Sequence, residues 1–75
     1  MRIGLLFHPR IEAAVRHSER VNQRLTDLGV DVWSASSFAI IEEPEPIEGS
    51  DLILTFGGDG TVLRAARTAA PFGVP

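Results

Sequence analysis

One stretch of the sequence decides the fold, and it reads Leu52-Ile53-Leu54-Thr55-Phe56-Gly57-Gly58-Asp59-Gly60-Thr61-Val62-Leu63-Arg64. An apolar run ends at two glycines, an aspartate and a third glycine follow, and the next residues have high helix propensity. This order predicts a strand, a tight glycine turn and the start of a helix. Because three glycines in four positions leave little side-chain bulk, a ligand can approach the backbone closely at this turn.

The rest of the chain contains further strand-like and helix-like segments. Residues 2–7 form a nearly continuous apolar run, which is typical of a strand buried on both faces of a parallel sheet. Residues 10–28 follow the spacing of an amphipathic helix, residues 30–33 and 51–56 are strand-like, and residues 61–70 are helical. The order predicts an α/β fold, with a small, open, Rossmann-like parallel sheet of three strands and flanking helices.

The connections between these segments are less regular. Gly29 is placed to end the first helix in the left-handed conformation. Ser34 to Ser37 end the strand pattern after Trp33, whose ring we expect to pack on the sheet. Residues 38–41 can form either one turn of helix or a loop. Residues 42–50 contain four glutamates and two prolines, which indicates a solvated connection rather than a cation site.

Composition narrows the class of protein. A chain of 75 residues has room for one small domain, and without cysteine it can form no disulfide or thiolate metal site. The net charge of -3 gives no indication of nucleic-acid binding. The apolar run at the start is too short for a signal peptide or a membrane span, so we expect no membrane association and a cytoplasmic location.

Two basic features have open roles. His8 ends the first strand beside Pro9, at the sheet edge where open α/β proteins bind ligands, or it is an ordinary turn histidine. Three arginines follow at four-residue spacing on one helix face: Arg16, Arg20 and Arg24. They can bind phosphates, but Glu12 and Asp27 at helical spacing favour a solvated face with local ion pairs.

The acid in the glycine turn allows several chemical roles. A strand, glycine turn and helix place unpaired N–H groups at one point, which favours an anion such as phosphate. Asp59 could then hold Mg²⁺, act as a general base or bind a ribose hydroxyl. It could instead be the N-cap of the following helix, and the spacing alone does not decide between these roles. The dinucleotide fingerprint and the P-loop are both absent.

The motif Gly57-Gly58-Asp59-Gly60-Thr61 resembles the signature of the superfamily of NAD kinases, diacylglycerol and sphingosine kinases, and 6-phosphofructokinases. Its continuation Val62-Leu63-Arg64-Ala65-Ala66-Arg67 is similar to the bacterial NAD kinases. Lipid kinases usually continue with Asn-Glu-Val, and phosphofructokinases usually have serine in place of the threonine. Ser50-Asp51 and the tail from Pro71 to Pro75 are also similar to the NAD kinases, so the resemblance is close over residues 50–75 and loose elsewhere.

The resemblance implies an activity and a set of site residues. It implies transfer of a phosphoryl group from ATP or polyphosphate to the adenosine 2′-hydroxyl of NAD, with a divalent metal such as Mg²⁺. Asp59 matches the family's proton acceptor, Asp59 and Gly60 would contact NAD, and Arg64 matches a further NAD-contacting position. Gly57, Gly58 and Thr61 complete the expected binding loop.

The chain also departs from the family pattern. The family's Asn-Glu motif, its later glycine-rich motif and its β-rich C-terminal domain are absent from residues 1–75. We therefore expect a partial N-terminal domain that is inactive alone, whose parent is an NAD kinase and a homo-oligomer. The alternatives are a lipid or sugar kinase of the same superfamily, or a non-catalytic α/β module that binds a nucleotide or docks a partner.

Overall fold

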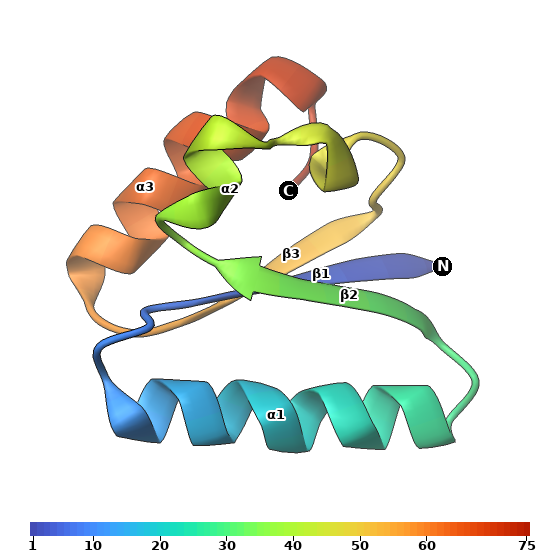
Figure 1. Cartoon of the computed structure of the whole chain (residues 1–75). Helices are drawn as coiled ribbons and strands as arrows, with labels where there is room; N and C mark the ends of the chain where they lie inside the picture. The colour runs from blue at the N-terminus through green and yellow to red at the C-terminus, as the bar shows by residue number, and fades with distance from the viewer.

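The computed structural model, which describes residues 1–75, has a parallel sheet as its middle layer (Figure 1). Its strands are β1 (Arg2–Phe7), β2 (Asp31–Ser36) and β3 (Leu52–Phe56), in the order β2-β1-β3. In the register, Phe7 at the end of β1 lies beside Ser36 on one side and Phe56 on the other. The carboxyl ends of all three strands therefore meet at one edge of the sheet, and the predicted α/β fold is confirmed.

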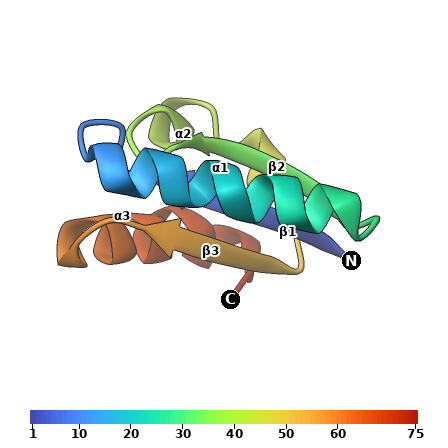
Figure 2. The same cartoon turned by 90° about the horizontal axis from the view of Figure 1, so that it is seen from below.

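Helices cover both faces of the sheet. The long helix α1 (Glu12–Asp27) lies on one face, and α2 (Ala39–Glu42) and α3 (Asp59–Ala69) lie on the other, as Figures 1 and 2 show. Two short 3-10 segments follow α2 and α3, at Glu45–Ile47 and Ala70–Phe72. None of the helices combines the length and the apolar character that crossing a bilayer would require.

The core lies between the sheet and the face that α2 and α3 cover. It is formed by five buried residues: Leu6, Ile40, Ile47, Ala65 and Ala69. Helix α3 buries Thr61, Ala65 and Ala69, which are spaced four apart and therefore lie on one face of the helix. These three side chains are small, so the backbone of α3 can lie close to the sheet.

Trp33 packs against this core, as predicted for its ring. Gly4 on the neighbouring strand makes the room, since a Cβ atom built there would meet the Trp33 ring and lie 2.8 Å from Ile53 Cδ1. The indole Nε1–H donates to Ser50 Oγ at 2.8 Å, and the Ser50 hydroxyl donates to the Pro46 carbonyl oxygen at 3.0 Å. The single tryptophan thus ties the connection before β3 to the sheet.

The structure extends β2 beyond its predicted end. The strand continues through Ser34–Ser36, because these residues pair with the end of β1 in register, Leu5 beside Ser34 and Phe7 beside Ser36. The expectation that the serines end the strand was therefore wrong, and pairing with a buried neighbour outweighs their low strand propensity. The next segment, which the sequence left open, forms one turn of helix as α2.

Two local predictions about α1 have different outcomes. Gly29 has the left-handed φ of +81° expected of the residue that ends the helix. Glu12 and Arg16 form the expected ion pair at 3.5 Å, but Arg24 forms none, and Asp27 instead accepts a hydrogen bond from Gln23 Nε2 at 2.9 Å. The three arginines at four-residue spacing, Arg16, Arg20 and Arg24, are exposed, as a solvated helix face requires.

Candidate functional site

The carboxyl edge of the sheet brings together residues from three segments that are distant in sequence. His8 follows β1, Phe38 follows β2, and the glycine turn at residues 57–60 joins β3 to α3. The His8 backbone N–H donates to the Phe56 carbonyl oxygen at 2.9 Å, so the first of these segments is tied to the start of the turn. This edge is where open α/β sheets bind their ligands.

Gly57 is the one position of the turn at which the backbone geometry requires a glycine. Its φ is +152°, a conformation that side-chain-bearing residues rarely adopt. A Cβ atom at this position would also meet the Thr61 side chain and lie 3.1 Å from His8 Cβ. At Gly58 and Gly60 an added Cβ would enter open space, so these two positions keep the outer surface of the turn bare.

Thr61 lies beneath the turn and is only 1% exposed. Its Oγ1 atom is buried and has no hydrogen-bond partner. Thr61 therefore supports Gly57 from inside the protein. In this it differs from the other residues of the motif, which are exposed.

Asp59 is the first residue of α3 and is exposed. The N-cap position belongs to Gly58, and no side chain caps this helix. The alternative that Asp59 is itself the N-cap is therefore wrong. Its carboxylate takes part in no side-chain hydrogen bond or ion pair, and a negative charge in the first turn is favoured by the helix dipole. The chain thus presents an unpaired carboxylate beside the bare glycine backbone.

Arg64 lies one turn further along α3 and is half-buried. Its guanidinium Cζ is 4.2 Å from the centre of the Phe38 ring, and its buried Nη1 has no hydrogen-bond partner. The Phe38 ring in turn packs against the His8 ring, with centroids 5.2 Å apart and planes at 83°. The Arg10 N–H donates to His8 Nδ1 at 3.2 Å, so in the neutral ring the other nitrogen carries the proton.

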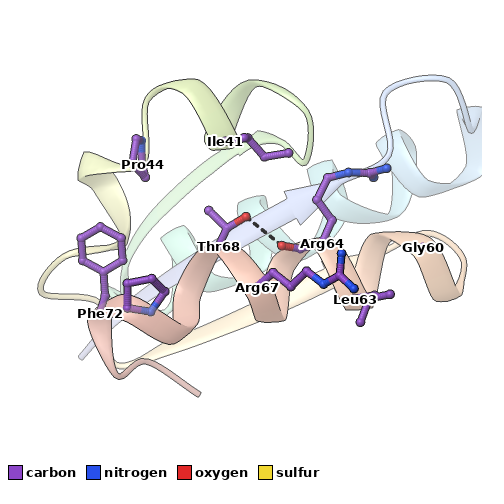
Figure 3. A pocket seen from close by; sticks show the side chains of 9 residues that line it. Ile41, Pro44, Gly60, Leu63, Arg64, Arg67, Thr68 and Phe72 are labelled. Atoms are coloured by element: carbon purple, nitrogen blue, oxygen red, sulfur yellow. Dashed lines mark hydrogen bonds between the residues drawn. The ribbon is translucent and has the colours of Figure 1, made fainter.

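Two hollows flank the glycine turn on opposite faces of the sheet. The larger, of about 760 Å³, lies between α2 and α3 and has Gly60, Arg64 and Arg67 in its wall (Figure 3). Its remaining wall is mostly apolar: Ile41, Pro44, Leu63, Thr68, Pro71 and Phe72. The smaller, of about 530 Å³, lies beside α1 and includes Gly57 and Gly58.

Sequence reasoning missed Phe38 as a neighbour of the predicted site. The predicted strand ended at Trp33, whereas β2 ends at Ser36 and thereby brings Phe38 to the carboxyl edge. No spacing in the sequence links Phe38 to Arg64, which is 26 positions later by residue number. Only the register of β2 on β1 could have revealed this contact.

The side chains of this chain do not form a metal site by themselves. No three residues among histidine, cysteine, aspartate and glutamate are grouped closely enough to hold an ion. A hard cation such as Mg²⁺ takes about six oxygen ligands and commonly draws several from substrate phosphates. Asp59 could supply one such oxygen, and the others would have to come from elsewhere.

Together these features are those of an α/β protein that is suited to bind a phosphate-bearing ligand. A bare glycine turn, a helix N-terminus and a nearby arginine at the carboxyl edge of a parallel sheet suit a ligand that carries phosphate. No family model matches the chain, and no solved structure matches it.

The chain is similar to curated proteins that are named NAD kinases. The chain is 35% identical over 74 residues to an NAD kinase of Dehalococcoides mccartyi, a match that covers 99% of this chain and 26% of the relative. It is 34% identical to an NAD kinase of Chloroflexus aurantiacus (99% of this chain and 27% of the relative). It is 38% identical to an NAD kinase of Thermobifida fusca, in a match that covers 95% of this chain and 26% of the relative.

These matches confirm the resemblance to the NAD kinases over nearly the whole chain. The chain spans about a quarter of the length of the curated relatives that it matches.

Proposed function

We propose that this chain forms part of an enzyme that phosphorylates NAD at the adenosine 2′-hydroxyl to give NADP. The observation that carries the proposal is the unpaired, exposed Asp59 in a segment that matches NAD kinases over 99% of its length. ATP or polyphosphate would be the phosphoryl donor. A cytoplasmic location and a homo-oligomeric parent belong to the same proposal.

Asp59 would act as the general base. Attack of a hydroxyl on phosphorus requires that the proton of that hydroxyl be taken up, and a positioned carboxylate can accept it. The Asp59 carboxylate is suited to this because no neighbouring donor in the chain occupies it. A divalent cation bound with the nucleotides would neutralise charge on the phosphates, which is the chemistry that the resemblance implies for it.

The turn and Arg64 would bind the nucleotide. Backbone N–H groups in the first turn of a helix have no carbonyl partner within it, so those of Asp59 and Gly60 can donate to the ligand. Gly57 and Gly58 would allow the ligand to approach, and Arg64 would contact a phosphate or the ribose. Thr61 would support the turn from inside the protein by packing against Gly57.

The test uses binding and turnover together. The 75-residue chain is titrated with NAD, and a chimera in which it replaces the matching segment of the Dehalococcoides mccartyi enzyme is assayed for NADP formation. Asp59→Asn in the chimera should lower kcat by about 10²–10⁴-fold, the usual contribution of a general base. The matched control is Asp31→Asn, since Asp31 is also exposed but begins β2 at the opposite edge of the sheet.

Two results would count against the proposal. The first is an Asp59→Asn chimera that forms NADP as fast as the Asp31→Asn chimera. The second is a folded chain that binds no NAD in the titration, together with a chimera that folds and forms no NADP. A chimera that fails to fold leaves the decision to the titration.

A further inference from the structure

Phe38 is the residue on which the Arg64 guanidinium rests, and its own position is fixed by the backbone. The Ser36 hydroxyl accepts hydrogen bonds from the N–H groups of Phe38 at 3.1 Å and Ala39 at 3.4 Å. The Ser37 N–H donates to the Phe7 carbonyl oxygen at 2.8 Å, which anchors this segment to the end of β1. The ring is therefore held at the carboxyl edge of the sheet before any ligand arrives.

The contacts around the ring explain why it would hold Arg64 in one place. A guanidinium within about 6 Å of an aromatic centroid is attracted to the face of the ring, and here the distance is 4.2 Å. The His8 ring packs perpendicular to Phe38, which restricts rotation of the platform. An arginine has many rotamers in water, so a platform of this kind reduces the entropy lost when a ligand binds it.

The surroundings of Arg64 also point to an anionic ligand. Its Nη1 atom is buried and unpartnered, so part of the guanidinium has lost water without gaining a hydrogen bond. Neither of the side-chain ion pairs that could compensate it, with Asp59 or with a glutamate, is present. A desolvated cation attracts an anion more strongly than one in bulk water, because less water screens the charge.

We propose that Phe38, braced by His8, is a positioning residue that holds Arg64 for contact with a phosphate group of the nucleotide. This inference rests on the proposed function and adds to it a residue that lies outside the glycine motif. It assigns Phe38 no contact with the substrate, so its effect on binding is transmitted through Arg64.

The first test reads the platform directly and needs no ligand. In the 75-residue chain with nitrogen-15-labelled arginine, the Arg64 Hε proton should be shifted upfield by the ring current of Phe38, away from the other six of the seven arginines. Phe38→Leu should abolish that shift and Phe38→Tyr should retain it. Phe72→Leu is the matched control, because Phe72 is 37% exposed against 39% for Phe38 and should leave the Arg64 signal in place.

The second test measures affinity for NAD and for inorganic pyrophosphate. Phe38→Leu should weaken binding of both by between about threefold and tenfold, as loss of a cation–π contact predicts, and Phe38→Tyr should restore it. Arg64→Ala should weaken binding at least as much, and adding Phe38→Leu to Arg64→Ala should cause no further loss.

The outcomes separate this inference from the proposed function. An unshifted Arg64 Hε in the wild-type chain, or Phe38→Leu binding as tightly as wild type, overturns the positioning role. Pyrophosphate binding that depends on Phe38 without any NAD binding supports the platform, and together with a folded chimera that forms no NADP it contradicts the NAD kinase proposal. Binding of neither ligand by the folded chain overturns the positioning role, and it overturns both proposals if the folded chimera also forms no NADP.

Discussion

Replacing Gly57 with alanine tests whether the glycine turn depends on this one position. The native φ of +152° would cost an alanine about 1–3 kcal/mol. The new Cβ would also meet the Thr61 side chain and His8 Cβ, and overpacking of that kind costs about 1–3 kcal/mol. The sum, about 2–6 kcal/mol, is a large part of the roughly 4–11 kcal/mol expected for a chain of 75 residues.

The assay is equilibrium unfolding in urea, followed by the fluorescence of Trp33, the single tryptophan of the chain. Gly58→Ala is the control from the same turn, because its φ is -91° and an added Cβ meets nothing within 4 Å. That substitution should stabilise slightly or have little effect, by about 0.4–1 kcal/mol at most. A Gly57→Ala chain with an unfolding free energy equal to that of Gly58→Ala would refute the reasoning.

A chemically synthesised chain with D-alanine in place of Gly57 keeps the test decisive if Gly57→Ala does not fold. A D-residue favours positive φ, so the conformational part of the cost is removed while the backbone stays the same. We expect this chain to fold and to unfold at a higher urea concentration than Gly57→Ala. If it is equally unstable, the φ of Gly57 is not what limits substitution there.

Other substitutions separate packing from binding. Gly4→Ala should lower the unfolding free energy by about 1–3 kcal/mol, because the new methyl overlaps the Trp33 ring, and an unchanged urea midpoint would contradict this. Ser50→Ala removes the acceptor of the indole N–H and should cost about 1–3 kcal/mol in the same assay. Gly60→Ala should stabilise α3 by up to about 1 kcal/mol yet weaken NAD binding, so thermal unfolding and NAD titration should move in opposite directions.

Local patterns predicted the elements that one stretch of sequence can specify by itself. The strand predicted over residues 51–56, the glycine turn and the left-handed Gly29 each follow from a few neighbouring residues. The structure agrees with all three, with β3 at Leu52–Phe56. The length of β2 did not follow, because Ser34–Ser36 are strand only through their pairing with β1. The role of Asp59 as N-cap was also undecidable from spacing, since Asp59 and Gly58 are both acceptable at that position.

The candidate site shows the same division. The motif from Gly57 to Thr61 and the companion Arg64 could be identified from the sequence, and their assignment as site residues stays a prediction. The contact of Arg64 with Phe38 could not, because it depends on where the segment after β2 lies relative to the middle of α3. Sequence order also gave no sign that Thr61 would face inward while Asp59 faces solvent.

The row of small buried residues on α3 has a consequence for how this protein tolerates change. Thr61, Ala65 and Ala69 set the spacing between the helix axis and the sheet, so the volume of these side chains fixes how far Asp59 stands from β3. A larger residue at Ala65 would lift the helix and carry the carboxylate outward with it, although Ala65 itself faces the core. Substitutions that a stability screen would score as simple packing defects would therefore also change the position of the Asp59 carboxylate.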